Sequence, residues 1–424
     1  NRFDLTGLPA TIHYQEFTSE QFSNELQLNF STDGLFGTGI GADGIAAFFY
    51  FHENSFEDNR TGFTGDPVPP AQASLLTQRV VLLGTGKAES YAAFANTTLH
   101  LTDRFGLKLG GRFTHESRAV DNSSLVILAN NARVSRALAD KKSFSDFTPE
   151  VGLEFKPSED ILFYYTYSEG FKTGAGLLGN LDQGISRPET IKNHEIGVKS
   201  SFFNRRLIAN VAAFSYRLSD LQVGRTVPTN ASGTGFAQRF ENAATLKGEG
   251  IEFEIKARPI PQLRIDAGAA YLNARFGEFQ SINQLDPEII LGPIAVPPRA
   301  PPIISLRGDR PRQSPKWSFN LHTDADVVSL ANGGRVVVAA DLSYKGEQFF
   351  SEFNAPVFRQ ASYTLIDAGV TYHSPDDRWS LSLFGKNLAN KLVSSGAFAV
   401  SLTRTVGQTF LPPRTYGATL GVNF

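Results

Sequence analysis

The stretch GIEFEIKARPIPQLRIDAGAAY, residues 250–271, decides the fold class of this chain. Its first half places Ile251, Phe253 and Ile255 at every second position, with charged residues between them. After a turn that contains two prolines at 259–261, the apolar and polar positions alternate again up to residue 271. Because successive side chains of a β-strand point to opposite faces, the stretch predicts a hairpin with one apolar and one charged face.

The same alternation recurs along the whole chain. Fifteen such segments start near residues 24, 44, 91, 105, 144, 161, 191, 205, 247, 262, 317, 334, 363, 379 and 415. Short turns near 103, 158, 204, 260, 331 and 376 alternate with long loops at 56–90, 121–143, 173–190, 221–246, 277–316, 347–362 and 392–414, and the connection at 32–43 is of moderate length. This regular alternation is typical of outer-membrane barrels, which have short periplasmic turns and long outer loops. We therefore predict an all-β fold, a transmembrane antiparallel up-and-down β-barrel whose apolar face contacts lipid.

Composition narrows the classes of function. The 424 residues include 40 basic and 42 acidic side chains, and this balance argues against a nucleic-acid partner. The absence of cysteine excludes disulfides and thiolate chemistry. The 7 histidines show no metal-ligand spacing, so we predict no metal site and no cofactor. No run of apolar residues is long enough for a transmembrane helix.

Strand direction carries a further expectation. The last strand follows a long loop, so it runs inward, and counting back makes the first visible strand run inward as well. Bacterial barrels have even strand counts, so we expect an odd number of strands to be missing. The chain starts at Asn1 without a signal segment, and we interpret its beginning as missing.

Several short motifs resemble a known family. They are FTPEVGLE at 147–154, YTYSEGFKTG at 165–174, RPET at 187–190 with HEIGVKS at 194–200, ENA at 241–243 with GEGIE at 248–252, SPKW at 314–317, GKNLANK at 385–391 and PRTYG at 413–417. In this order, over residues 20–424, they resemble the barrel of TonB-dependent outer-membrane receptors.

The resemblance implies a barrel of about 22 strands, so that fifteen visible strands would leave roughly seven missing. The plug domain, the TonB box and the first strands are not in this sequence, so residues 1–424 are interpreted as the C-terminal part of the receptor barrel. The resemblance implies a location in the outer membrane of a Gram-negative bacterium. It also implies active uptake of a scarce, bulky nutrient such as a ferric siderophore, a cobalamin or an oligosaccharide, driven by the TonB complex acting on the plug.

Arginines in two long loops are the candidate ligand-binding residues, because a guanidinium fork suits carboxylate or phosphate groups. They are Arg225, Arg239, Arg307, Arg310 and Arg312. The alternative, which we rate higher, is that they are solvated or bind the phosphates of lipopolysaccharide.

Aromatic residues form a second group of candidates. Phe349, Phe350 and Phe353 could stack on a ligand, but a place in the outer aromatic belt is favoured. The final strand contains Tyr416 and ends at Phe424, and such an ending resembles the signal that the barrel-assembly machinery recognises.

Two other functions remain open. A passive porin would need neither plug nor TonB. A barrel hydrolase is suggested by Ser318, His322, Asp324 and Asp326, which lie on one predicted face. Residues four apart on a strand are about 13 Å apart, however, so Ser318 and His322 cannot pair directly.

Two further motifs are given structural interpretations. We interpret the glycine-rich stretch at 37–41 as a periplasmic turn rather than a phosphate loop, because no helix follows it. Arg307-Gly308-Asp309 matches an adhesion tripeptide, and we interpret this match as chance.

Overall fold

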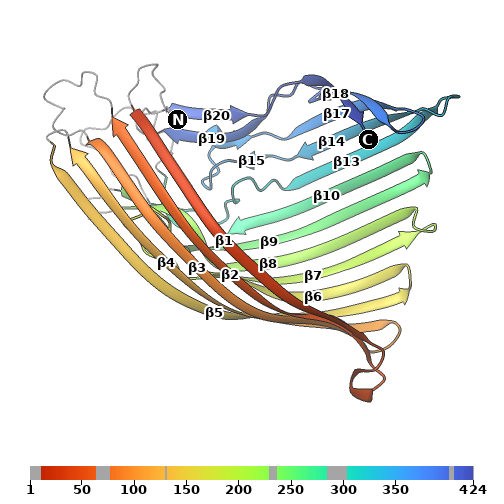
Figure 1. Ribbon diagram of the computed structural model, residues 1–424, viewed down its shortest axis with the longest axis horizontal. Coiled ribbons are helices and arrows are strands. Elements are labelled where there is room, and N and C mark those ends of the chain that lie inside the picture. Colours follow the sequence, from red (N-terminus) through yellow and green to blue (C-terminus); the bar gives the residue numbers. More distant parts are fainter. Residues whose placement is uncertain are drawn as a thin grey trace.

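One large antiparallel sheet dominates the fold. The computed structural model describes residues 11–63, 77–128, 131–228, 236–283, 303–400 and 405–423. The sheet has 15 strands in the order β1-β2-β3-β4-β5-β6-β7-β8-β9-β10-β13-β14-β17-β18-β21, so each strand pairs with the next strand of this same sheet along the chain (Figure 1). Among the described residues, no helix has the length and apolar character needed to cross a membrane.

The strands of this sheet are β1 (Thr11–Thr32), β2 (Gly41–Phe63), β3 (Thr77–His100), β4 (Phe105–Leu128), β5 (Arg133–Ser158), β6 (Ile161–Lys172), β7 (Glu189–Phe202), β8 (Leu207–Pro228), β9 (Phe236–Ile260), β10 (Leu263–Phe276), β13 (Trp317–Ser329), β14 (Arg335–Lys345), β17 (Tyr363–His373), β18 (Trp379–Lys386) and β21 (Thr415–Val422). Three small hairpins lie in the connections: β11 (Gln280–Ile282) with β12 (Ile303–Ser305), β15 (Gln348–Phe349) with β16 (Arg359–Gln360), and β19 (Ser394–Val400) with β20 (Thr405–Phe410). Two short 3-10 turns complete the described elements, η1 (Leu35–Gly37) and η2 (Pro356–Phe358). Each of the fifteen predicted segments corresponds to one strand of the large sheet, which confirms the predicted fold class.

The register explains the alternation in the sequence. One row of directly opposite residues crosses six strands: Tyr165, Ile196, Ala213, Ile251, Tyr271 and Trp317. This face is apolar but open, and 62% of the Ile196 side chain is exposed. An apolar face of this kind suits lipid, because the antiparallel ladder satisfies the backbone groups inside the sheet.

Three predicted loops are mostly strand, so their boundaries were wrong. Instead of loops at 56–90, 121–143 and 221–246, the structure extends the strands far past the apolar band. The ladder of β4 and β5 continues to Ile127 opposite Arg133, and that of β8 and β9 continues to Pro228 opposite Phe236. Beyond the lipid both faces of a strand can be polar, so the alternation disappears although the hydrogen bonds continue.

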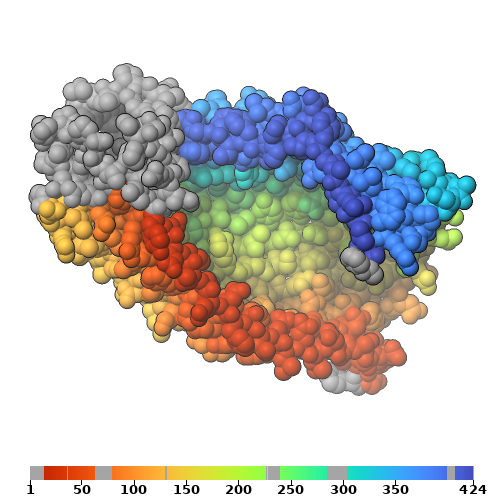
Figure 2. All heavy atoms as spheres, turned by 45° about the horizontal axis from the view of Figure 1, so that its top comes forward, coloured from red at the N-terminus to blue at the C-terminus, as the bar shows by residue number. Residues whose placement is uncertain are grey.

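The sheet curls into a trough that is open along one side. Its order runs from β1 to β21, and the described ladders do not include a pairing between these two strands. Figure 2 shows the hollow interior, with β1 in red along one rim and the C-terminal strands in blue along the other. The two edges therefore present backbone donors and acceptors that a closed barrel would pair.

The connection after β6 folds onto the inner face of β3 to β5. The amide of Asn122, which is fully buried, donates to the carbonyl oxygens of Leu177 at 3.0 Å and Asn180 at 2.8 Å. Its Oδ1 accepts the backbone N–H of Gly179 at 2.9 Å. Gly84 makes room for this packing, because a Cβ there would lie 2.8 Å from the backbone nitrogen of Gly179. Part of the predicted loop 173–190 thus covers the wall of the trough.

The glycine-rich stretch at 37–41 forms the tight connection between β1 and β2. Gly37 and Gly39 have φ angles of 76° and 75°, which glycine adopts at little cost. The Leu35 N–H donates to the Ile40 carbonyl at 2.7 Å and closes the turn. This geometry agrees with the turn that the sequence predicted.

Candidate ligand site at the outer mouth

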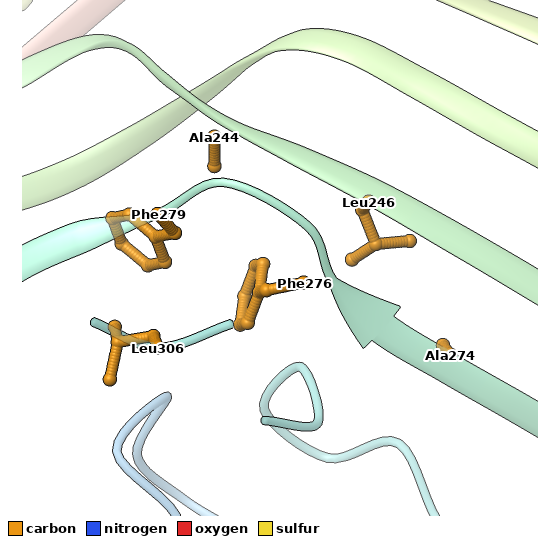
Figure 3. Packing of buried hydrophobic residues seen from close by; sticks show 6 residues of the cluster. All are labelled: Ala244, Leu246, Ala274, Phe276, Phe279 and Leu306. Atoms are coloured by element: carbon orange, nitrogen blue, oxygen red, sulfur yellow. The ribbon is translucent and has the colours of Figure 1, made fainter. Parts of the chain in front are cut away.

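A small apolar core lies where the connection after β10 folds over the inner wall (Figure 3). Its buried members are Ala244, Leu246, Ala274, Phe276, Phe279 and Leu306, and Phe353 packs against them. The rings of Phe276 and Phe279 lie 5.0 Å apart at 58°. Hydrophobic burial therefore holds this connection against β9 and β10, which positions the polar groups around it.

Arg307-Gly308-Asp309 forms a tight turn in this connection. The Gly308 N–H donates to the Phe276 carbonyl at 2.9 Å, and the Phe276 N–H donates to the Asp309 carbonyl at 3.0 Å. Gly308 has a φ of 88°, a conformation that favours glycine. Burial raises the pKa of the Asp309 carboxyl, although Arg275 partly opposes this effect. The tripeptide is thus part of the fold of the loop.

A polar pocket of about 660 Å³ opens between β8, β9 and the β11–β12 hairpin. Its lining includes Arg225, Glu241, Phe279, Ser305 and Arg307. Arg225 donates through Nε to Glu241, and its Nη1 donates to the Gln280 carbonyl at 3.2 Å. The exposed guanidinium of Arg307 has no ion pair within the described ranges, so it is available to an anionic group.

Arg310 and Arg312 hold loops together. The Arg310 side chain is 12% exposed, and it donates to the Glu347 carboxylate at 2.6 Å and to the Glu347 carbonyl at 3.0 Å. Its guanidinium lies 5.0 Å from the centre of the Phe349 ring. Arg312 donates to the carboxylate of Glu352. Both arginines are therefore already engaged with carboxylates, and a ligand would have to compete for them.

The three phenylalanines lie inside the folded loops rather than in a lipid-facing belt. Phe350 is 9% exposed, Phe353 packs against the apolar core, and Phe349 lies beneath Arg310. The favoured belt placement was therefore wrong, because the loop folds inward and buries its own aromatic side chains. Aromatic rings of the outer face at this end include Tyr271 and Trp317, whose centres are 4.8 Å apart.

The remaining candidates lie elsewhere. Arg239 is exposed on β9, directly opposite Arg225. Tyr416 is 70% exposed on β21. Phe424 lies outside the described residues.

The sequence did not single out a polar network that anchors the connection between β6 and β7. The Asn242 amide donates to the carbonyls of Arg187 at 2.8 Å, Pro188 at 3.1 Å and Asp220 at 2.7 Å. Gln222 is buried and donates to the Thr173 carbonyl at 2.8 Å. Asn242 belongs to the ENA motif at 241–243, so the motif was visible although its structural role was not.

The geometry of the inner wall does not assemble a hydrolase triad. His322 Nδ1 lies 2.7 Å from Asp341, and its Nε2 lies 3.4 Å from Asp324. Ser318 lies opposite Ala270 and Lys345 in the ladders and does not face His322. Within the described ranges, no group of three or more His, Asp or Glu side chains is placed to hold a metal ion.

Comparison with known families decides the identity of the fold. The family described as "TonB dependent receptor-like, beta-barrel" matches residues 1–388. The chain belongs to the TonB-dependent receptors. It is therefore an outer-membrane β-barrel protein of the kind found in Gram-negative bacteria, and the members that it matches are receptors and transporters.

The relatives of this receptor are distant in sequence. The ferrichrome outer membrane transporter/phage receptor of Escherichia coli K12 is 22% identical over 294 residues, which cover 68% of this chain and 32% of the relative. The ferric-pyoverdine M114 receptor of Pseudomonas sp. M114 is 23% identical and is covered over 33% of its length.

Solved structures show the same fold. The ferric yersiniabactin uptake receptor FyuA from Yersinia pestis gives a TM-score of 0.75 at 17% identity, covering 98% of this chain and 56% of that one. The siderophore receptor PiuA from Acinetobacter baumannii gives 0.68, also at 17% identity, with 96% and 56% covered. The chain thus spans about a third of these curated relatives and just over half of these solved structures.

Proposed function

We propose that this barrel belongs to a receptor that takes up a ferric siderophore across the outer membrane, with energy supplied through TonB. The pocket at the outer mouth is the main support, because it places the guanidinium of Arg307, which makes no ion pair among the described residues, beside the Arg225–Glu241 pair. The relatives and solved structures described above are named for iron chelates or siderophores, which favours this ligand class over a cobalamin or an oligosaccharide.

The chemistry of the pocket suits a small, partly anionic chelate. Its volume of about 660 Å³ lies within the range of small-molecule sites. A guanidinium fork can bind a carboxylate or catecholate oxygen through two hydrogen bonds. The iron would enter inside the ligand, so the barrel itself needs no metal site, and the proposal assigns it no enzymatic activity.

The proposal extends to parts that lie beyond these residues. A plug segment would fill the trough, complete the ligand site from below and carry the contact with the TonB complex. The open edges of β1 and β21 would pair with further strands of the same barrel. The C-terminal strand with Tyr416 and Phe424 would be recognised by the barrel-assembly machinery, and deleting Phe424 is expected to lower the amount of heat-modifiable receptor in the outer membrane.

The test uses the complete receptor in a host that makes no other siderophore receptor. Binding and uptake of radioactive iron are measured with a panel of ferric siderophores, and Arg307→Gln is compared with Arg133→Gln, an exposed cation outside the pocket. Loss of one charge-assisted contact, discounted for exposure, predicts roughly tenfold weaker binding for Arg307→Gln only.

Deletion of the host tonB gene separates this proposal from a passive porin. Active uptake should stop in the deletion strain, while binding at the cell surface should persist. Iron entry that continues at an undiminished rate without TonB would contradict the proposal and favour the porin. Equal losses of binding in Arg307→Gln and Arg133→Gln would show that the pocket is not part of the ligand site.

A further inference from the structure

The pocket at the outer mouth contains one uncompensated charge of each sign. Arg307 and Glu278 both line it, and both side chains are exposed. Within the part of the chain that the structure describes, neither side chain forms an ion pair or a hydrogen bond, so the two do not pair with each other. The other charged residues of the lining, Arg225 and Glu241, are already paired. The pocket therefore offers both a cation and an anion to a ligand.

The β11–β12 hairpin places these two residues at corresponding positions. Its ladder continues one step towards the base of the hairpin, because the Leu306 N–H donates to the Phe279 carbonyl at 2.9 Å (Figure 3). Glu278 and Arg307 are the next residues on the two segments, and both line the same pocket. Residues that face each other across a ladder are close neighbours. A ligand that uses both charges must therefore present its complementary charges close together.

The backbone under both charges is anchored to the inner wall. The Glu278 N–H donates to the Thr245 hydroxyl at 2.9 Å, and the Glu278 carbonyl accepts from the Thr245 N–H at 3.0 Å. On the other segment the Gly308 N–H, next to Arg307, donates to the Phe276 carbonyl at 2.9 Å. These bonds fix where each side chain starts, so only its own torsions have to be ordered when a ligand binds. Such a pre-organised site loses less entropy on binding than a mobile loop.

The charge balance of the pocket selects against a purely anionic ligand. Its described lining contains two arginines and two glutamates, so their charges cancel. A carboxylate bound by Arg307 would lie beside the carboxylate of Glu278, and like charges placed side by side repel. A neutral ligand would displace water from both charged groups without replacing the lost hydrogen bonds. A positive group next to the ligand's carboxylate avoids both costs.

We propose that the pocket recognises a zwitterionic group on the ferric chelate, such as a free amino-acid group, with its carboxylate on Arg307 and its ammonium on Glu278. The guanidinium fork donates two hydrogen bonds to the carboxylate, and the glutamate accepts from the ammonium. Glu278 is thus a specificity-determining residue, because it distinguishes among chelates that all carry a carboxylate. This inference rests on the proposed function, since it assigns a chemical class to the ligand of the same pocket.

The experiment measures how tightly the complete receptor binds an uncharged ferric trihydroxamate that carries one pendant amino-acid group. Two derivatives differ from this parent only in that group: acetylation removes the charge of the amine, and amidation removes the charge of the carboxylate. For the wild-type receptor we expect acetylation to weaken binding roughly fivefold and amidation roughly tenfold, because water screens contacts with exposed charges and the guanidinium contact has two hydrogen bonds.

Variants of the two residues assign each ligand charge to its partner. Glu278→Gln should bind the parent and the acetylated derivative equally, while amidation still weakens binding. Arg307→Gln should show the reverse pattern. Asp121→Asn is the matched control, because it removes an exposed carboxylate of β4 that lies outside the pocket, and it should keep both wild-type preferences. A fully anionic ferric tris-catecholate should bind at least threefold more tightly to Glu278→Gln than to wild type.

The outcomes separate this inference from the proposed function. If acetylation weakens binding to Glu278→Gln as much as binding to wild type, the ammonium site is overturned. If amidation affects Arg307→Gln as much as wild type, the carboxylate contact is overturned. A receptor that takes up other ferric siderophores through TonB, but binds the parent probe no better than its two derivatives, keeps the proposed function and loses this inference. A receptor that binds none of the ferric chelates loses both.

Discussion

Glu347 holds two connections together at the outer mouth, and replacing it with glutamine tests how these loops are fastened. Its carboxylate accepts from Arg310 at 2.6 Å and from Arg359 at 2.6 Å. Nearby backbone bonds join the same segments, because the Gln313 N–H donates to the Phe349 carbonyl at 2.9 Å. Glu347→Gln keeps the shape of the side chain but removes its charge.

The size of the effect follows from exposure. Charge-assisted hydrogen bonds contribute about 1.5–3 kcal/mol each, whereas exposed ion pairs contribute only about 0.2–1 kcal/mol. The Arg310 side chain is 12% exposed, but Glu347 is 37% exposed, so a value between these ranges is appropriate. We expect loop opening to become easier by about 1.5 kcal/mol, which corresponds to roughly tenfold faster exchange of the protected amides.

Hydrogen exchange of the backbone amides of Gln313 and Phe350 provides the assay, since both donate to carbonyls of the joined segments. Glu278→Gln is the control, because Glu278 is exposed and its carboxylate makes no ion pair among the described residues. Exchange within twofold of wild type at both amides in Glu347→Gln would refute the idea that this carboxylate fastens the loops.

The pH dependence gives the same prediction a second readout. Burial alone raises the pKa of Glu347, but hydrogen bonds from Arg310 and Arg359 outweigh it and lower the pKa below the ordinary value of 4.5. A carboxyl whose pKa is lowered in the closed state stabilises that state above its open-state pKa. This contribution is lost as the pH falls through the lowered value. After correction for intrinsic rates, exchange should stay constant from pH 8 to 5 and rise below about pH 4, and Glu347→Gln should lack this rise.

Three further substitutions test the packing of the wall and its loops. Asn242→Asp places a carboxylate oxygen against three carbonyls, so we expect a loss of about 2–4 kcal/mol in the anchoring of the loop after β6, measured as faster limited proteolysis there. Phe276→Ala opens a cavity in the apolar core at a cost of about 3–5 kcal/mol, and the β11–β12 hairpin should become sensitive to protease while the barrel remains heat-modifiable. Gly250→Ala puts a Cβ 2.3 Å from the Phe214 ring and 2.6 Å from the Tyr271 carbonyl. The amount of assembled, heat-modifiable receptor should therefore fall to less than half of wild type. A wild-type amount would show that the strands can shift to accommodate the added methyl group.

The membrane part of the fold could be predicted because each strand must by itself present an apolar face to lipid. Ile251, Phe253 and Ile255 must be apolar whatever their neighbours are, so a single strand carries the signal. The turns were also predictable, since Gly37 and Gly39 adopt positive φ angles that few other residues tolerate. These local requirements identified the fifteen strands of the large sheet and their order within the described residues.

The loops could not be predicted because their structure depends on partners far away in the sequence. Asn122 binds Leu177 and Asn180, and Arg310 binds Glu347, contacts that no local pattern specifies. Arginine in a loop is equally compatible with a ligand and with a structural ion pair. Only the distances between side chains in the structure distinguish the two cases. Arg310 is paired with Glu347, whereas Arg307 makes no ion pair among the described residues.

The limits of strands and the limits of the membrane are encoded by different features. On β9 the apolar alternation ends at Ile251, yet the strand continues back to Phe236 and stays paired with β8. The outer-face positions that follow the apolar band change to Glu249 and then to Lys247, and the neighbouring strands change in register with them. Hydrogen bonding along the ladder therefore determines where a strand ends. The medium that contacts the outer face, lipid or water, determines where the apolar pattern of the strand ends. A coordinated change across four adjacent strands is the signature of a boundary between lipid and water, and Lys192, Arg217, Lys247 and Arg275 lie just beyond the apolar band at that boundary.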